Sequence, residues 1–212
     1  MRNLSLIDRL LGELQHGLNT SHARPAAATR DFPAKGISDD DLDDVEIAHS
    51  AGLMRVNNAG EVAAQGLYRG QALSARAAAL SESMQQAAEE ENEHLNWCQR
   101  RLAELNQRRS LLDGVWYWGS FTIGALAGVA GDRWSLGFVK ETEQQVCAHL
   151  DRHMQGLPAA DHRSRAILQA MRADELRHAE NAAAAGAAEL PAPIKAGMTL
   201  VSKIMTFSAY RI

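Results

Sequence analysis

Six residues with metal-binding side chains recur in this sequence in two sets of matching spacing. They are Glu61, Glu91, His94, Glu143, Glu175 and His178. In each set a lone glutamate precedes a Glu-x-x-His motif, by 30 residues in the first set and by 32 in the second. Residues three apart lie on one face of a helix, so each motif would direct a carboxylate and an imidazole to the same point. Oxygen and imidazole ligands without thiolate suit non-haem iron or manganese, so the pattern predicts a carboxylate-bridged site for two metal ions.

Four long helices are expected to position these ligands. Alanine is abundant, proline is scarce and Val/Ile/Thr runs of strand length are nearly absent, so the sequence predicts an all-α fold. The four helices are expected at about residues 41–80, 83–106, 136–155 and 160–188. A break near Gly52 or Asn57-Asn58 is an alternative to a continuous first helix. Each successive pair would form a hairpin, and the two hairpins would form a four-helix bundle.

The candidate ligands interrupt apolar helix faces, which indicates that they point into the bundle. In the second helix, for example, Glu91 and His94 share a face with Leu95 and Leu102. Four buried glutamates would be strongly destabilising if all were charged and unpaired, because burying each ion costs several kcal/mol. Two divalent cations would balance four carboxylate charges, which supports the two-metal interpretation.

Asp174, directly before one motif glutamate, is the candidate for orienting a ligand from behind. A carboxylate beside a ligand can accept the N–H of an imidazole across the site, and we expect Asp174 to do this for His94. An exposed aspartate paired with Arg172 or Arg177 is the alternative. Four further histidines are not expected to bind metal: His49, His149, His153 and His162.

An apolar segment, residues 114–131, separates the two predicted hairpins. It reads GVWYWGSFTIGALAGVAG, carries no formal charge and has its aromatic residues near one end. A membrane-spanning helix is one interpretation, although the length is marginal and five glycines are unfavourable. A buried crossover helix between the hairpins is another. Because Trp and Tyr favour the membrane interface, we expect a surface for a membrane or a hydrophobic ligand, which is compatible with the crossover.

A last helix is predicted after Pro191 and Pro193. One of its faces carries four apolar residues, Ile194, Met198, Val201 and Met205. We expect this face to cap the bundle as part of the core. Contact with a lipid-like chain is the alternative, because methionine side chains adapt to irregular partners.

The first 38 residues are expected to stand apart from the functional domain, residues 39–212. Apolar residues at helical spacing over residues 4–18 predict a short amphipathic helix that could dock on the bundle, a partner or a membrane. Residues 20–38 contain prolines and no apolar periodicity, which indicates a linker. The aspartates that follow favour a helix start, because negative charge stabilises a helix N-terminus.

Composition excludes several other classes of function. The net charge is −4 and no basic stripe is present, so no nucleic-acid partner is expected. The two cysteines, Cys98 and Cys147, lie in separate predicted helices without a Cys-x-x-Cys motif, which fits a reducing, cytosolic setting. Asp8, Arg9 and Glu13 interrupt any apolar core of a signal peptide, so secretion is not expected.

The segment Met54-Arg-Val-Asn-Asn-Ala-Gly-Glu61 adds a more specific pattern to the ligand spacing. With the Glu-x-x-His motif at Glu91, Glu143 in Glu-Thr-Glu and the Asp-Glu-x-x-His motif at Asp174, it resembles the demethoxyubiquinone hydroxylases of ubiquinone biosynthesis, over roughly residues 45–212. Ferritins, rubrerythrins and related oxidases share the ligand pattern alone. The first segment is the part that is most specific to the hydroxylases.

This resemblance implies a ferritin-like bundle in which the six ligands hold two iron ions, with Glu91 and Glu175 as candidate bridges. It implies a monooxygenase that uses O₂ and two electrons to hydroxylate the ring of a polyprenylated demethoxy-benzoquinol, demethoxyubiquinol. His149 matches a histidine of the family that could assist proton or electron transfer. Because the substrate is a membrane lipid, we expect peripheral association with the cytoplasmic side of the cell membrane.

Partners and alternative functions stay open at this point. No Gly-x-Gly-x-x-Gly fingerprint is present, so electrons would come from the quinol, a small reductant or an electron-donor protein. The first and last helices could each contact another ubiquinone-biosynthesis protein or form a homo-oligomer. The alternatives to the hydroxylase are a ferritin-like peroxidase, catalase or ferroxidase, and a non-catalytic lipid-quinone-binding bundle. Manganese could replace iron, because imidazole and carboxylate accept both.

Overall fold

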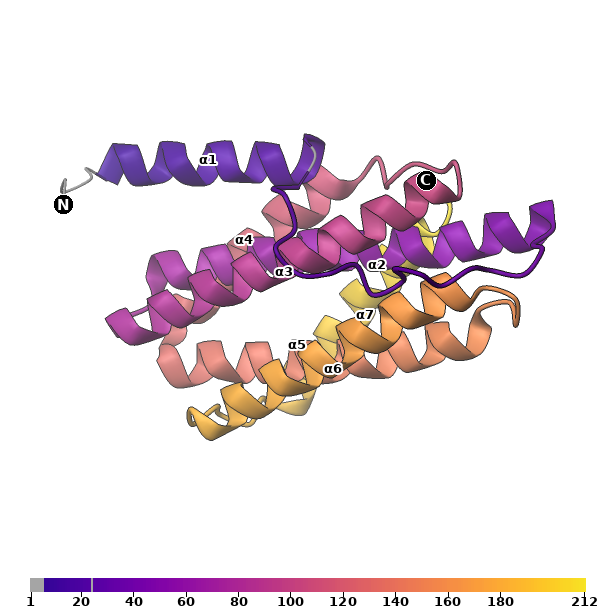
Figure 1. Cartoon of the computed structure of the whole chain (residues 1–212). Coiled ribbons are helices and arrows are strands. Elements are labelled where there is room, and N and C mark those ends of the chain that lie inside the picture. Colours follow the sequence, from indigo (N-terminus) through magenta and orange to yellow (C-terminus); the bar gives the residue numbers. More distant parts are fainter. Residues whose placement is uncertain (1–5, 24) are drawn as a thin grey trace.

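The computed structural model describes residues 6–23 and 25–212, and this part of the chain forms seven helices and no strand. The helices are α1 (Leu6–His22), α2 (Asp44–Ser74), α3 (Ala78–Glu104), α4 (Asp113–Ala130), α5 (Asp132–Gly156), α6 (His162–Ala184) and α7 (Ala192–Ala209). Figure 1 shows the four long helices α2, α3, α5 and α6 running along the length of the molecule. The prediction of an all-α fold is confirmed.

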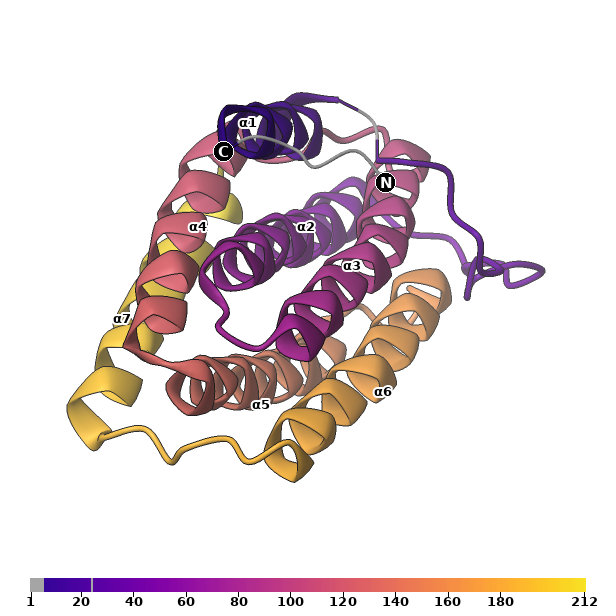
Figure 2. The same ribbon diagram turned by 90° about the vertical axis from the view of Figure 1, so that its left-hand side faces the viewer.

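Four of these helices form the predicted bundle. Seen from one end in Figure 2, α2 lies beside α3, α5 lies beside α6, and the two hairpins pack against each other. The crossover helix α4 connects the hairpins over the outer side of α2, and α7 lies on the same side of the bundle. The sequence therefore predicted the ferritin-like bundle, its apolar crossover and its extra C-terminal helix correctly.

The bundle begins at the acidic turn that the sequence indicated. The Asp43 carboxylate accepts the backbone N–H of Val45 at 2.9 Å and of Glu46 at 2.8 Å. In return, the Glu46 carboxylate accepts the N–H of Asp43 at 3.1 Å. This reciprocal pair satisfies N–H groups that the first turn of a helix leaves unpaired.

The first hairpin turns earlier than predicted. The helix expected to reach residue 80 ends at Ser74, and α3 begins at Ala78 instead of residue 83. The cause is tertiary, because the carboxylate of Asp132, at the start of α5, accepts the backbone N–H groups of Arg76 and Ala77 at 3.0 Å. A contact with a residue so far along the chain leaves no local signal in the sequence.

Within α2 the break considered near Gly52 or Asn57-Asn58 does not occur. The Asn58 amide donates to the Asp113 carboxylate at 3.3 Å, and Asn57 Oδ1 lies 2.9 Å from His153 Nδ1. Asparagine disfavours helices mainly by hydrogen bonding to its own backbone. Here both side chains bind neighbouring helices, so the helix continues.

The interior of the bundle consists of an apolar cluster toward each end and a polar layer between them. The first cluster includes Met54, Leu102, Leu150 and Leu168. The second includes Tyr68, Met84, Leu136 and Ala182. Each helix passes from one cluster to the other through the positions of the predicted ligands. The packing therefore keeps the polar layer away from water.

The α4 helix packs against α2 with unusually close backbones. A Cβ atom on Gly70 would lie 2.1 Å from the carbonyl oxygen of Phe121, and one on Gly124 would lie 2.1 Å from that of Leu67. Only glycine fits at such a contact. The glycines that weakened residues 114–131 as an isolated helix therefore allow α4 to seat on α2.

The opposite side of α4 faces outward. Val115, Leu126 and Val129 are 60%, 66% and 64% exposed. None of the described helices combines the length and the hydropathy that crossing a membrane requires. The apolar residues of α4 thus divide between the contact with α2 and the surface.

The predicted amphipathic N-terminal helix corresponds to α1, although residues 4 and 5 lie outside the described part of the chain. Its polar side docks on α2, where Glu13 pairs with Arg69 at 2.7 Å and His16 Nε2 lies 3.1 Å from Gln65 Oε1. Three leucines on its other side are about half exposed: Leu11, Leu14 and Leu18. The apolar side of α1 thus lies at the surface of the described part of the chain.

The segment predicted as a linker is packed against the bundle. Residues 25–43, here called the strap, contain no helix, and they contact α3 and α6. Phe32 and Ala34 of the strap are 8% and 0% exposed and belong to the first apolar cluster. The division of the chain at residue 38 stays a prediction.

The prediction that α7 caps the bundle as core is wrong. Ala209 is the one buried residue among Ala192–Ala209, and Leu200, Ile204 and Phe207 are all more than half exposed. The face that carries Met198 and Met205 is half-buried and lines a cavity instead. The physical reason is that α4 already covers α2, so α7 packs beside it and leaves a space between.

Candidate metal centre

The six residues predicted from their spacing converge in the polar layer. One group consists of Glu61, Glu91, His94 and Glu175, and a second consists of Glu91, Glu143, Glu175 and His178. Within each group the ligand atoms all lie within 4.8 Å of one another, and every residue is buried. Glu91 and Glu175 belong to both groups, which is the position that a bridging carboxylate requires. Each group could hold a metal ion.

His94 presents one ring nitrogen to the carboxylates and the other to Asp174. Its Nδ1 lies 2.8 Å from Glu91, 3.1 Å from Glu175 and 3.4 Å from Glu61. Its Nε2 lies 3.0 Å from Asp174 Oδ2. The predicted contact between Asp174 and His94 is confirmed, and it directs Nδ1 toward the first group.

His178 repeats this arrangement with a residue that the sequence analysis missed. Its Nδ1 lies 3.3 Å from Glu91 and 3.4 Å from Glu175, and its Nε2 lies 2.7 Å from Glu90 Oε2. The signal for Glu90 was present, because Glu90 precedes Glu91 as Asp174 precedes Glu175. Each hairpin therefore contributes an acidic residue that orients the imidazole of the other hairpin.

Tyr68 is a second residue whose role was missed. Its hydroxyl donates a hydrogen bond to the Glu143 carboxylate, and its side chain is fully buried. Tyr68 shares the inner face of α2 with Glu61, so its position on that face was evident from the spacing. Its partner on α5 was not, because the contact joins residues 75 positions apart.

In the absence of metal, the surroundings of two of the carboxyl groups favour their protonated forms. Burial raises the pKa of Glu61 well above its ordinary value; the bond to His94 opposes this shift, and the negative charges of Glu91 and Glu175 add to it. Burial and the charge of Glu175 likewise raise the pKa of Glu143 well above its ordinary value. Burial thus favours the neutral form of both carboxyls when no cation is nearby.

The other two carboxyls are charged and are balanced by the imidazoles. Burial alone would raise the pKa of Glu91 and Glu175, but the hydrogen bonds and charges of the imidazoles lower both below their ordinary values. Burial opposes charge on His94, yet the charge of Glu91 and the bond to Asp174 raise its pKa well above its ordinary value. The nearby carboxylates of Glu175 and Glu91 similarly outweigh burial and raise the pKa of His178 to about 12. When no metal is bound, the pKa shifts thus favour a proton on each of four groups: the Glu61 and Glu143 carboxyls and the His94 and His178 imidazoles.

Hydrogen bonding supports the fit of metal ions to this site. Glu91 Oε1, Glu175 Oε2 and His178 Nδ1 are buried and make no hydrogen bond within the described part of the chain. Buried polar atoms without partners are costly, and those found in native proteins require an explanation. All three atoms belong to residues of the second group. Carboxylate and imidazole donors without thiolate match the preference of iron and manganese.

An apolar cavity of about 340 Å³ reaches the carboxylates. Its lining includes Glu61, Glu143 and Glu175. The rest of the lining comes largely from α2, α5 and α7, among them Leu67, Phe138, Val146, Met198 and Val201, and α4 adds Ser120 and Ile123. A hydrophobic molecule in this cavity would therefore lie directly against the polar layer.

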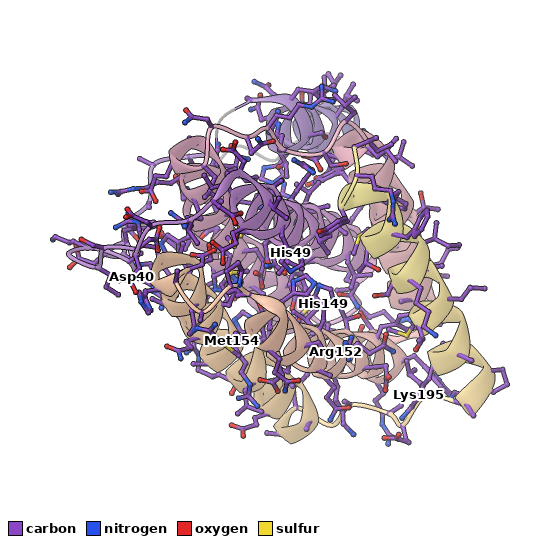
Figure 3. All side chains as sticks on the ribbon, turned by 90° about the vertical axis from the view of Figure 1, so that its right-hand side faces the viewer. Asp40, His49, His149, Arg152, Met154 and Lys195 are labelled. Carbon is purple, nitrogen blue, oxygen red and sulfur yellow. The ribbon has the colours of Figure 1, made fainter. Side chains whose placement is uncertain are left out.

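His149 also lines this cavity and is not in either ligand group. Its ring centroid lies 3.8 Å from that of His153. Burial, with a smaller effect from the Arg152 charge, lowers the pKa of His149 to about 4. Figure 3 shows His149 on the inner side of α5 and Arg152 toward the outside. The prediction that His149 is not a metal ligand agrees with this geometry.

The fold and the site together define a ferritin-like carboxylate bundle whose core could hold two metal ions. Comparison with known proteins narrows this class, since residues 48–209 match the family described as "Ubiquinone biosynthesis protein COQ7". The chain belongs to this family and is an enzyme. The resemblance noted from the sequence is therefore confirmed.

Three relatives illustrate the similarity, and each is named 3-demethoxyubiquinol 3-hydroxylase. The protein of Chromobacterium violaceum is 55% identical over 207 residues, which cover 98% of this chain and all of the relative. That of Xanthomonas oryzae pv. oryzae is 54% identical over 208 residues, covering 98% and 95%. That of Nitrosococcus oceani is 53% identical over 211 residues, covering 100% and 99%. The similarity thus extends through the strap and α1 as well as the bundle.

Proposed function

We propose that this enzyme is a di-iron monooxygenase that hydroxylates the ring of a polyprenylated demethoxy-benzoquinol, demethoxyubiquinol, with O₂. The observation that carries the proposal is the apolar cavity whose lining includes Glu61, Glu143 and Glu175. A peroxidase, catalase or ferroxidase has no need of such a cavity. The names of the relatives and the donor set of the site support the same reaction.

The two ligand groups would hold one iron ion each, with Glu91 and Glu175 shared between them. When bound, the two irons supply the redox chemistry that activates O₂ for transfer of one oxygen atom to the ring. Asp174 and Glu90 keep the imidazoles of His94 and His178 turned toward the site. Tyr68 donates a hydrogen bond to Glu143 and limits the rotation of that carboxylate.

The cavity residues bind the substrate and exclude water. Ile123, Phe138 and Met198 offer apolar contact to the ring and to the first part of the isoprenoid tail. His149 is neutral at pH 7, so it can accept a hydrogen bond from a quinol hydroxyl.

The substrate would reach the cavity from a lipid surface, which places the enzyme peripherally on the cytoplasmic side of the cell membrane. The exposed apolar residues of α1, α4 and α7 support this proposal, with Leu14, Leu126 and Phe207 as examples. Such residues can enter the interfacial region without a spanning segment. An electron-donor protein, another ubiquinone-biosynthesis protein and a second copy of the chain stay predicted partners.

The test is a single-turnover assay with a cavity variant and a matched control. The protein is loaded anaerobically with Fe²⁺, supplied with demethoxyubiquinol in detergent and exposed to O₂, and the quinone products are followed by mass spectrometry. Gly60 lines the cavity and Gly119 does not, and an added Cβ meets no atom within 4 Å at either position. We expect G60L to raise at least tenfold the quinol concentration that gives half of the maximal single-turnover product, with two irons still bound. G119L should behave as wild type. Consumption of peroxide without a hydroxylated quinone would instead favour the peroxidase alternative.

A further inference from the structure

The strap places a side chain beside the metal centre, although nothing in its sequence suggests this role. Arg30 Nη1 lies 2.6 Å from Asp174 Oδ2, the oxygen that also lies 3.0 Å from His94 Nε2. Asp174 is 3% exposed, so water does little to screen this ion pair at the carboxylate. One oxygen atom therefore joins the strap to the imidazole of a candidate ligand.

The strap is anchored on both sides of this contact. The Glu93 carboxylate accepts the N–H groups of Thr29 and Arg30 at 2.7 and 3.2 Å, and the Thr29 hydroxyl at 2.9 Å. The Arg30 guanidinium lies 4.8 Å from the centroid of the Trp97 ring, within the range of a cation–π contact. Glu93 and Trp97 flank His94 on α3. The backbone and the guanidinium of Arg30 are thus both held in place.

We propose that Arg30 is a positioning residue of the metal centre, which holds Asp174 against His94 so that His94 Nδ1 faces the first ligand group. The inference rests on the proposed function of that group as a metal site. The other oxygen of Asp174 lies 2.8 Å from Arg177. Without Arg30, the carboxylate can turn toward Arg177 and release the imidazole, because Arg177 is half exposed and free to follow.

The effect is confined to one of the two metal positions. His178, in the second group, is oriented by Glu90, and Glu90 lies on α3 with Arg177 as its further partner at 3.6 Å. Arg30 acts on His94, which belongs to the first group alone. Loss of Arg30 should therefore weaken the binding of one metal ion, in the first group, and leave the binding of the other unchanged.

The experiment is a Co²⁺ titration of the full-length metal-free protein, followed by the ligand-field absorption of the bound ion. Three variants are compared with wild type: R30Q, R30K and K35Q. Lys35 is a matched control, because it lies in the strap and pairs with the exposed Asp31 at 3.1 Å. We expect wild type and K35Q to bind two equivalents alike. R30Q should bind one equivalent normally and the other roughly tenfold or more weakly, the usual cost of losing a residue behind a ligand.

Two further readouts separate positioning from a general structural role. R30K should recover most of the lost affinity, because it restores a cation beside Asp174. Metal-free R30Q should unfold at the same temperature as K35Q. Unchanged affinity for both equivalents in R30Q would overturn the inference, as would equal weakening of both together with a lower unfolding temperature. If wild-type protein binds no Co²⁺, the proposed metal centre itself fails, a result distinct from any effect of Arg30.

Discussion

Loading the metal-free protein with two divalent cations at pH 7 should release about four protons. The protons come from two carboxyls and two imidazoles whose pKa values are raised: Glu61, Glu143, His94 and His178. Ligands must be deprotonated to bind metal, so each cation displaces about two protons. Because the raised pKa values favour retention of these protons, metal affinity should rise with pH. The logarithm of the binding constant for the pair should gain up to about four for each pH unit between pH 6 and 8.

Calorimetry with Co²⁺ in buffers of different ionisation enthalpy measures the number of protons released. E61Q should lower this number by about one, because it removes one of the protonated carboxyls. E189Q is the control, since Glu189 is exposed and pairs with Lys140 on the surface, and it should leave the number unchanged. Release of two protons or fewer by wild-type protein would refute the reasoning. It would mean that burial does not hold Glu61 and Glu143 in their neutral forms.

Two other substitutions test the packing and the site. G70A should lower the free energy of unfolding by about 1–3 kcal/mol in urea denaturation, because its methyl group would meet the Phe121 carbonyl. G119A, with open space at the Cβ position, should instead be neutral or stabilising, and equal effects of the two would contradict the close contact. E90Q should weaken metal binding about 10–100-fold in a Co²⁺ titration, because Glu90 orients His178. Unchanged affinity would argue against that role.

The sequence predicted the convergence of the six side chains because the information in their spacing is local. The Glu-x-x-His spacing specifies one helix face, so convergence of the six ligands followed from the helices alone. The same logic identified Asp174 and could have identified Glu90, which occupies the equivalent place before its motif. Both are recognisable from their place directly before a motif glutamate, although their imidazole partners lie on another helix.

The features that the sequence did not reveal depend on tertiary contacts. The strap has no periodicity, and its order comes from single side chains such as Phe32 and from bonds to Glu93. The early end of α2 depends on Asp132, far along the chain. The exposure of α7 depends on α4, which already occupies the adjacent face of α2. Composition cannot rank such competing contacts. The predictions of a linker at residues 20–38 and of a core position for the last helix therefore followed what such segments do on average in proteins.

The direct backbone contact between α2 and α4 has a mechanical consequence. Side chains between two helices normally act as a compressible layer, and at Gly70 and Gly124 that layer is missing. A displacement of α4 is therefore transmitted directly to α2, the helix that carries Glu61. The α4 wall of the cavity is stiff for this reason. We expect α7 to be the more flexible wall of the cavity. Exchange of a bulky quinol for its product should then depend on how far α7 can move.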